Sequence, residues 1–312
     1  MEKLHVITVI SNPVRYQSRY KLYKNFEKYM NSNPNVVLYT AEMAYGDRPF
    51  EVTEANNPNH LQLRSSDELW HKENMMNLVL HKLPNDWKYV AWVDADVIFS
   101  RPDWAEETIH QLQHYHVVQM FSECRDLDDK YSGVPGSDMK GMIWCHYNME
   151  QSNSDKAYGK RQGHCGYAWA ARRETLEFTG GFLDVSILGS GDYQMATAFL
   201  GNISTSIGGV KYHPDYIKAL HNWGEKAKKI RNNVGYVEGL LLHNWHGAKL
   251  NRGYKDRWKI LVEHKYNPLT DIERDWQGLY KLVDNGSKKY IGLRDDLRTY
   301  FRARDEDNKR QR

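Results

Sequence analysis

The chain has 312 residues, of which 40% are hydrophobic and 27% charged, and its net charge is +3. This length can bury the core of one large α/β domain or of two smaller ones. No apolar run approaches the roughly 18 residues that a membrane-spanning helix needs. The three cysteines are widely spaced and match neither a zinc-knuckle pattern nor a disulfide framework. We therefore expect a cytoplasmic protein with reduced thiols and no membrane span.

The first hundred residues alternate between strand and helix patterns. Residues 6–10 and 36–40 are apolar runs rich in β-branched residues and predict strands, so the N-terminus is expected to be a strand rather than a signal peptide. Residues 18–30 carry apolar side chains at helical spacing. Residues 46–63 are expected to form a loop near a nucleotide, and residues 67–80 a helix. This alternation predicts parallel strands joined by right-handed crossovers.

Two acidic residues, Asp94 and Asp96, follow the next apolar run, residues 88–93. On an extended chain, residues i and i+2 point to the same side, so the two carboxylates are expected to project together. Mg²⁺ and Mn²⁺ prefer carboxylate oxygens and share their coordination shell with substrate phosphates. Ligands of open α/β sheets bind at the carboxyl ends of the strands, and the pair therefore indicates a nucleotide-phosphate site. The alternative is a polar turn with solvated carboxylates.

Polar residues after the first two strands are further candidates. Ser11, Asn12 and Arg15 follow the first strand and are expected to line a nucleotide and diphosphate pocket, with Arg15 offering paired donors to phosphate. Glu42 follows the second strand, where acids of doubly wound folds often bind the base or the ribose hydroxyls. For all four residues, a solvated loop is the alternative.

The second half of the chain contains a polar stretch and an acidic candidate. Residues 126–161 have few periodic apolar positions and predict long substrate-facing loops, or else an insertion without a role. Asp192 precedes a helical pattern over residues 193–200. It is a candidate base for an acceptor hydroxyl, and the alternative is an acid that caps the helix.

Two histidines lie in the apolar segment Leu241–Gly247. Strand alternation places His243 and His246 on opposite faces, so only one of them is expected to face a metal. Residues 211–265 hold twelve Lys or Arg against five acids. This segment could bind a donor diphosphate or a polyanion such as DNA, or it could be an ordinary solvated surface.

Taken in order, these segments resemble GT-A glycosyltransferases with an Asp-x-Asp motif, including glycogenin-like and bacterial galactosyltransferase-like families. The resemblance spans roughly residues 4–260. It rests on the segments Leu69–Asn77, Leu83–Asp96, Gly166–Arg173, Gly180–Asp184, Gly189–Gln194 and Leu241–Gly247. It implies a mixed α/β sheet flanked by helices. The catalytic domain would cover residues 1–265, with a nucleotide-sugar half at about 1–100 and an acceptor half at about 101–265, followed by a helical extension and charged tail at 266–312.

The resemblance also implies an activity, the transfer of a sugar from a nucleotide-sugar, most commonly a UDP-sugar, to an acceptor hydroxyl with Mn²⁺ or Mg²⁺. Its metal ligands would be Asp96, one of His243 and His246, and Asp94, which could instead touch the ribose. The spacing departs from the family's His-x-x-Gly pattern, because an extra residue separates His243 from Gly247 and leaves His246 as a competing ligand. The other implied roles are donor binding by Lys72, Lys249, Arg252 and Arg257, acceptor chemistry by Asp192, and an apolar face for a sugar ring from Tyr167 or Trp169.

The acceptor is the least constrained part of this interpretation. The basic segment and the resemblance to phage enzymes that glycosylate hydroxymethylated DNA bases favour double-stranded DNA, and a phage-encoded enzyme would act in the host cytoplasm. A cell-envelope or capsular glycan is the alternative acceptor. A nucleic-acid-binding module without catalysis is the alternative of another class. A nucleotidyltransferase would be expected to carry a glycine-rich loop near the N-terminus, and Ile10–Arg15 contains no glycine.

Overall fold

A central mixed sheet organises the chain in the computed structural model, which describes residues 2–149, 163–254 and 256–308. Its strand order is β10-β6-β9-β4-β1-β2-β3, and the pairs formed by β9 are antiparallel while the other pairs are parallel. The strands are β1 (Leu4–Ser11), β2 (Val36–Tyr45), β3 (His60–Ser65), β4 (Tyr89–Val93), β6 (Val117–Gln119), β9 (Ala168–Arg172) and β10 (Val234–Tyr236).

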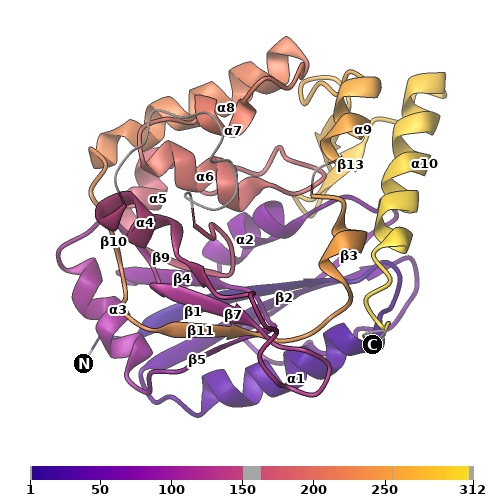
Figure 1. Cartoon of the computed structure of the whole chain (residues 1–312). Helices are drawn as coiled ribbons and strands as arrows, with labels where there is room; N and C mark the ends of the chain where they lie inside the picture. Colours follow the sequence, from indigo (N-terminus) through magenta and orange to yellow (C-terminus); the bar gives the residue numbers. More distant parts are fainter. Residues whose placement is uncertain (1, 150–162, 255, 309–312) are drawn as a thin grey trace.

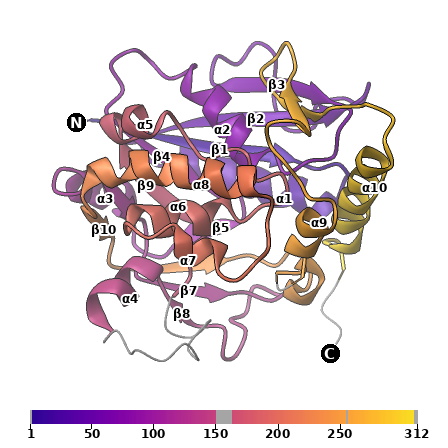
Figure 2. The same cartoon turned by 90° about the horizontal axis from the view of Figure 1, so that it is seen from above.

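Helices cover both faces of this sheet. In Figure 1, α2 (Lys72–Leu80), α6 (Gly191–Phe199) and α8 (Pro214–Ala227) lie above it, and α1 (Gln17–Asn31) lies below it. Figure 2 shows α6 and α8 from above, crossing in front of the sheet. Because successive side chains of a strand point to opposite faces, Ile7 packs in the core under α2 and α6, and Val6 packs in the core against α1 and α3 (Trp104–Leu112).

A smaller sheet adjoins the carboxyl end of β4 and determines where the histidines lie. Its order is β5-β11-β7-β8, with β5 (Val97–Phe99), β11 (Leu240–His243), β7 (Glu123–Asp126) and β8 (Met139–Lys140). Strand β5 begins directly after Asp96, and the antiparallel register places His243 opposite Val97. The last residue of β11 is thereby brought beside the acidic turn.

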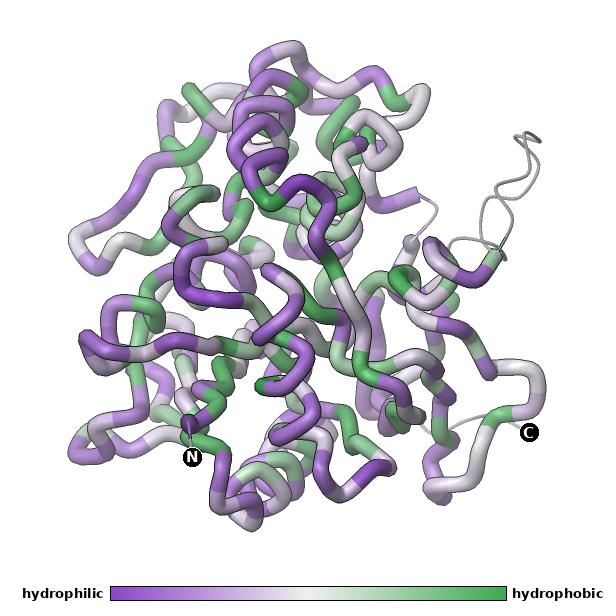
Figure 3. The backbone as a smooth tube through the Cα atoms, turned by 90° about the vertical axis from the view of Figure 1, so that its left-hand side faces the viewer, coloured by the Kyte–Doolittle hydropathy of each residue, from purple (hydrophilic) through white to green (hydrophobic). Residues whose placement is uncertain are grey.

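The remaining elements complete the fold around these sheets. They are α4 (Met142–Asn148), α5 (Arg173–Thr179), α7 (Ser204–Ile207), the 3-10 turns η2 (Lys228–Ile230) and η3 (Lys249–Arg252), α9 (Trp258–Glu263), β12 (Ile272–Arg274), β13 (Tyr280–Leu282) and α10 (Lys288–Ala303). Helix α10 buries Leu293, Leu297, Tyr300 and Phe301. Figure 3 shows hydrophobic and hydrophilic residues alternating along the outer helices, as expected for helices that cover a core with one face.

The expected fold class, an α/β mixed sheet flanked by helices with a helical C-terminal extension, is confirmed. The loop expected over residues 46–63 is wrong at its end, because the chain forms the edge strand β3, whose pairing with β2 uses backbone groups that no side-chain pattern announces. The helix expected from residue 67 begins at Lys72. Residues 150–161 of the substrate-facing loops expected over residues 126–161 lie outside the described residues, and residues 126–149 include β8 and α4. Within the described part of the chain, no helix is long and apolar enough to span a membrane.

Candidate functional site

A cavity of about 370 Å³ lies at the carboxyl ends of β1 and β4. Its walls come from the end of β1, the start of α2, the Asp94–Asp96 turn, the 164–167 segment, the start of α6 and the end of β11. The chain from Phe301 to Arg304, at the end of α10, closes one side. Segments far apart in the sequence thus meet at the sheet edge where α/β folds bind their ligands.

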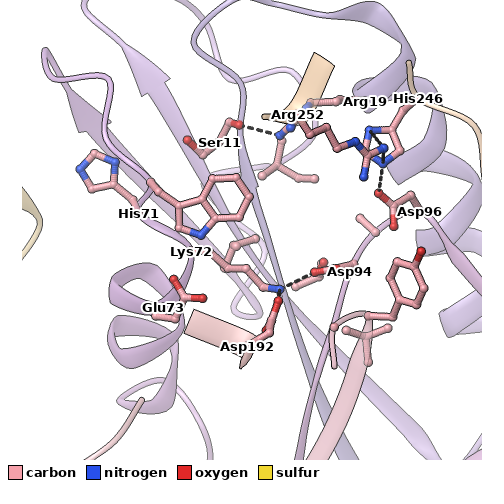
Figure 4. Close-up of a pocket in the computed structure, with 18 of the residues that line it drawn as sticks. Ser11, Arg19, His71, Lys72, Glu73, Asp94, Asp96, Asp192, His246 and Arg252 are labelled. Carbon is pink, nitrogen blue, oxygen red and sulfur yellow. Dashed lines mark hydrogen bonds and ion pairs between the residues drawn. The ribbon is translucent and has the colours of Figure 1, made fainter. Parts of the chain in front are cut away.

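Lys72 connects two carboxylates in this cavity (Figure 4). Its ammonium group lies 2.6 Å from Asp94 and 3.2 Å from Asp192. Burial opposes the positive charge, but Asp192 and Asp94 outweigh it and hold the pKa of Lys72 well above its usual value. Burial raises the pKa of Asp94 to about 6, although Lys72 acts against that change. The buried ammonium group of Lys72 therefore pairs with both carboxylates.

A third acid, Glu73, lies beside this group with only 2% of its surface exposed. Burial and the negative charge of Asp192 raise the pKa of Glu73 to about 8, so its carboxyl group is largely protonated at neutral pH. Position 191 is glycine for a steric reason, because a Cβ atom there would lie 2.3 Å from the Glu73 carboxylate. The preceding Ser190 adopts φ +78°, a strained conformation for a residue with a side chain. Backbone strain and close packing thus fix the turn that presents Asp192.

The other aspartate of the motif, Asp96, faces two histidines. Its carboxylate lies 2.9 Å from Nε2 of His246 and 3.8 Å from Nε2 of His243, and the two Nε2 atoms are 3.2 Å apart. One ligand atom from each residue falls within 4.8 Å of the others. Among the described residues, Oδ1 of Asp96 is buried without a hydrogen-bond partner. The side chains of Asp96, His243 and His246 therefore form a compact group of metal-ligating atoms.

Each imidazole also has a carboxylate partner at its second nitrogen. Nδ1 of His243 lies 2.9 Å from the carboxylate of Asp126, and Nδ1 of His246 lies 3.3 Å from that of Glu306. A carboxylate accepts, so Nδ1 is the protonated nitrogen of neutral His243, whose Nε2 is 3.8 Å from Asp96. An amino group of Arg252 lies 2.8 Å from Nε2 of His246 and 3.3 Å from its Nδ1. Burial lowers the pKa of His243 to about 4, which keeps this imidazole neutral at pH 7.

This arrangement fits a divalent cation. Two imidazole lone pairs and one carboxylate oxygen converge, and neutral imidazole with carboxylate is a common donor set for first-row transition ions. The expectation that only one histidine would face this point is wrong, because β11 ends at His243 and the chain to Gly247 leaves the strand, so alternation does not extend to His246. Asp94 does not belong to this group, since its contact is Lys72.

Positive side chains surround the rest of the cavity, with Arg19, Arg252, Arg257 and Arg304 in its lining. Arg257 donates to Ser190 and to Tyr300. Lys249 lines a neighbouring second cavity and pairs with Asp126 at 2.5 Å. The expected phosphate-binding residues Arg252 and Arg257 thus lie at the cavity, and Lys249 lies next to it.

Of the four candidates that follow the first two strands, only some line the cavity. Ser11 lines the cavity and shares a hydrogen bond with Tyr45. The Asn12 side chain is buried and bonds the backbone of Tyr16, and Arg15 pairs with Glu51 at the surface. Neither of these two side chains lines the cavity.

Glu42 also lies away from the cavity. Its buried carboxylate accepts hydrogen bonds from the backbone N–H groups of residues 51–53 and from the Thr53 hydroxyl. Its oxygens are occupied by the loop that they anchor, and Glu42 does not line the cavity in which the nucleotide is expected.

The two aromatic candidates also differ. Tyr167 lines the cavity and stacks between His164 at 3.8 Å and His243 at 4.6 Å between ring centroids. Trp169 lies on β9, which is covered on both faces, and it is 2% exposed. Of the two alternatives for the apolar face, only Tyr167 therefore lines this cavity.

Several residues at the site escaped the sequence analysis, namely Arg19, Glu73, Asp126, His164, Arg304 and Glu306. Glu73 had a signal, since it adjoins Lys72 at the start of a helix that points at the Asp-x-Asp turn. Asp126 and Glu306 gave none, because they contact the histidines from 117 and 60 residues away along the chain.

No protein-family model and no curated protein matches the sequence. Among solved structures, a chain assigned as a nucleotide-diphospho-sugar transferase from Desulfovibrio desulfuricans is similar at 10% identity and a TM-score of 0.33, covering 96% of this chain and 99% of that one. A variant of Drosophila β-1,4-galactosyltransferase 7 in complex with manganese, UDP-Gal and xylobiose is similar at 9% identity and a TM-score of 0.39, covering 94% and 99%. Staphylococcus aureus TarS is similar at 12% identity and a TM-score of 0.36, covering 73% and 72%. At these values the similarities are too distant to assign an activity to this chain.

Proposed function

We propose that this protein is a metal-dependent glycosyltransferase that moves a sugar from a nucleotide-sugar, a UDP-sugar in the first instance, to an acceptor hydroxyl. One observation carries the proposal, the convergence of Asp96 with the Nε2 atoms of His243 and His246 beside a cavity that also holds Asp192. A cation held by these three ligands would neutralise the diphosphate of the donor. The two imidazole donors favour Mn²⁺ over Mg²⁺, which prefers an all-oxygen shell.

The side chains around the cavity suit a displacement at the anomeric carbon. Asp192 would accept the proton of the acceptor hydroxyl, and the oxygen of that hydroxyl would bond to the anomeric carbon. The bond from the anomeric carbon to the diphosphate breaks, and its electron pair leaves with the diphosphate oxygen. Arg19 and Arg252 line the cavity and provide positive charge for this leaving group. Lys72 orients Asp192 through its ion pair.

For the acceptor, we propose a glycan hydroxyl, as in a cell-envelope or capsular polymer, in preference to a hydroxymethylated base of phage DNA. The DNA hypothesis depended on a basic and aromatic surface over residues 211–265. Two of its aromatic members, Tyr216 and Trp223, are core residues at 1% and 7% exposure. Two of its basic residues, Lys228 and Lys259, form ion pairs with neighbouring acidic side chains. The surface is therefore less basic and less aromatic than the sequence indicates, which weakens the case for a polyanion acceptor and for a binding module without catalysis.

A donor-hydrolysis and transfer screen tests this function. A panel of nucleotide-sugars is incubated with Mn²⁺ or Mg²⁺, and the released nucleotide and the intact mass of the acceptor are measured with glycan acceptors and with hydroxymethylated DNA. The enzymes compared are the wild type, Asp96→Ala and Asp192→Asn, with Asp103→Asn as a matched control because Asp103 is exposed and pairs only with Arg101 in the described structure.

The proposal expects Asp96→Ala to lose donor hydrolysis and transfer together. Asp192→Asn should still bind donor and lose transfer by about 10²- to 10⁴-fold, the usual contribution of a positioned base. The control should behave as the wild type. Full activity in Asp96→Ala, or nucleic-acid binding without turnover of any donor, would contradict the proposal. Transfer to hydroxymethylated DNA alone would restore the DNA hypothesis for the acceptor.

A further inference from the structure

The C-terminal tail, residues 304–308, lies against the metal-ligating group. Glu306 is 1% exposed, and its carboxylate reaches Nδ1 of His246 at 3.3 Å, on the ring edge opposite the nitrogen that faces Asp96. The same carboxylate pairs with Arg304 at 2.6 Å and with Arg19. Residues 304–308 of the charged tail expected at the end of the chain are held in place, because Glu306 contacts two buried side chains, His246 and Arg304, and the partly exposed Arg19.

Several contacts hold this tail against distant parts of the chain. Asp307 accepts hydrogen bonds from the backbone N–H groups of Gln17 and Ser18, the first residues of α1. The Asp305 backbone N–H donates to the Tyr16 hydroxyl. In Figure 1 the tail leaves α10 and runs toward the N-terminal end of α1. These contacts place Glu306 by fixing the backbone on both sides of it.

The loop that carries His246 is shaped to receive the tail. Gly247 adopts φ +87°, and a Cβ atom at this position would lie 2.8 Å from Cα of Glu306. Only glycine permits both this backbone conformation and the close approach. The residue directly after His246 is thus fitted to the residue that contacts the His246 ring.

The other imidazole has an equivalent partner. Asp126 contacts Nδ1 of His243 at 2.9 Å, as Glu306 contacts Nδ1 of His246. A carboxylate on the remote nitrogen of a metal-binding histidine fixes the ring orientation and strengthens the ligand. Both histidines of the group are therefore held in the same way, although their partners come from unrelated segments.

We propose that Glu306 is a positioning residue for His246 and that the C-terminal tail is part of the metal site rather than an appendage to α10. The proposal rests on the function proposed above, in that it requires Asp96, His243 and His246 to bind a cation. It assigns no ligand bond to Glu306. Its prediction is that the affinity for Mn²⁺ depends on Glu306, which contacts the proposed ligand His246 and also holds Arg19 and Arg304.

The test measures Mn²⁺ binding to the full chain by titration calorimetry and the visible absorption of the Co²⁺-loaded protein, which reports coordination directly. Glu306→Gln is expected to weaken Mn²⁺ binding by about 10- to 100-fold, the usual effect of removing such a partner, and to alter the Co²⁺ spectrum. Asp126→Asn should act in the same direction through His243. Asp305→Asn is the matched control, because its carboxylate bonds Asn308 and not the histidines.

The outcomes separate this proposal from the function on which it rests. If the wild type binds no Mn²⁺, or binds it no more tightly than Asp96→Ala does, both the proposed function and the role of Glu306 are overturned. Wild type that binds while Glu306→Gln keeps the same affinity and Co²⁺ spectrum overturns only the role of Glu306, which is then a structural ion-pair partner of Arg19 and Arg304. If Glu306→Gln does not fold, Asp307→Ala decides, because it loosens the tail at α1 without touching the histidines. A several-fold weaker affinity supports the proposal, and unchanged affinity overturns it.

Discussion

The buried Glu73 predicts that the stability of this protein falls as the pH rises from weakly acidic to weakly basic values. Its pKa is raised from the ordinary 4.5 to about 8, mainly by burial. The folded protein therefore keeps the Glu73 proton up to about pH 8, whereas the unfolded chain releases it near pH 4.5. Stability that is fully present below pH 4.5 is lost as the pH rises to about 8. At about 1.4 kcal/mol per pH unit, the interval corresponds to roughly 5 kcal/mol.

Replacing Glu73 by Gln removes the ionisable group and keeps its size, which matters because Gly191 packs directly against it. The free energy of unfolding of Glu73→Gln minus that of the wild type should increase steadily between pH 5 and pH 8 and then level off. At pH 8 the variant should unfold about 7 °C above the wild type. Asp94, whose pKa is raised to about 6, changes stability in the same direction, but it is present in both proteins.

The assay is reversible urea unfolding at several pH values, followed by tryptophan fluorescence and circular dichroism. Glu177→Gln is the control, since it removes an exposed carboxylate that pairs with Arg173 on the surface of α5. Parallel stability curves for Glu73→Gln and wild type between pH 5 and pH 8 would refute the reasoning, because they would mean that Glu73 ionises alike in the folded and unfolded states.

Three further substitutions test other contacts. Glu42→Gln should cost about 1–3 kcal/mol and speed amide exchange in residues 51–53, with unchanged nucleotide binding, because Glu42 anchors a loop and does not line the cavity; weaker nucleotide binding at unchanged exchange would contradict this. Lys72→Met should lower stability by about 2–4 kcal/mol, measured by urea unfolding, because it leaves Asp94 and Asp192 without their shared cation. Trp169→Phe should lower stability by about 1–3 kcal/mol with the acceptor KM unchanged, and a raised KM would return Trp169 to the acceptor site.

The local part of the fold was readable from the sequence because it depends on periodicity. The strands β1, β2 and β4 and the helix α1 follow from alternating or helical apolar patterns, and the acidic turn follows from where β4 ends. The burial of Trp169 could not be predicted in this way. A strand covered on both faces carries large apolar residues on both sides, so a pattern of residue types cannot separate a core tryptophan from one that faces a cavity.

Only part of the candidate site could be predicted from the sequence. Asp94, Asp96, Asp192 and the two histidines stand in short, distinctive segments, but the pairing that joins them is long-range. Whether Asp94 contacts a cation or Lys72 depends on the placement of α2, and whether His246 faces Asp96 depends on the chain leaving β11. The proposed role of Glu306 could not be predicted from the sequence, since it requires the tail, α1 and the His246 loop to meet.

The meeting of the tail with α1 has a consequence for the order of folding. The hydrogen bonds between them join residues 287 to 290 positions apart. Contacts of such separation cost the most chain entropy to close, so they are expected to form late and to open early, before the sheet does. Occupation of the metal site would then be coupled to closure of nearly the entire polypeptide, and amide exchange at the start of α1 would register the arrival of an ion that lies outside that helix.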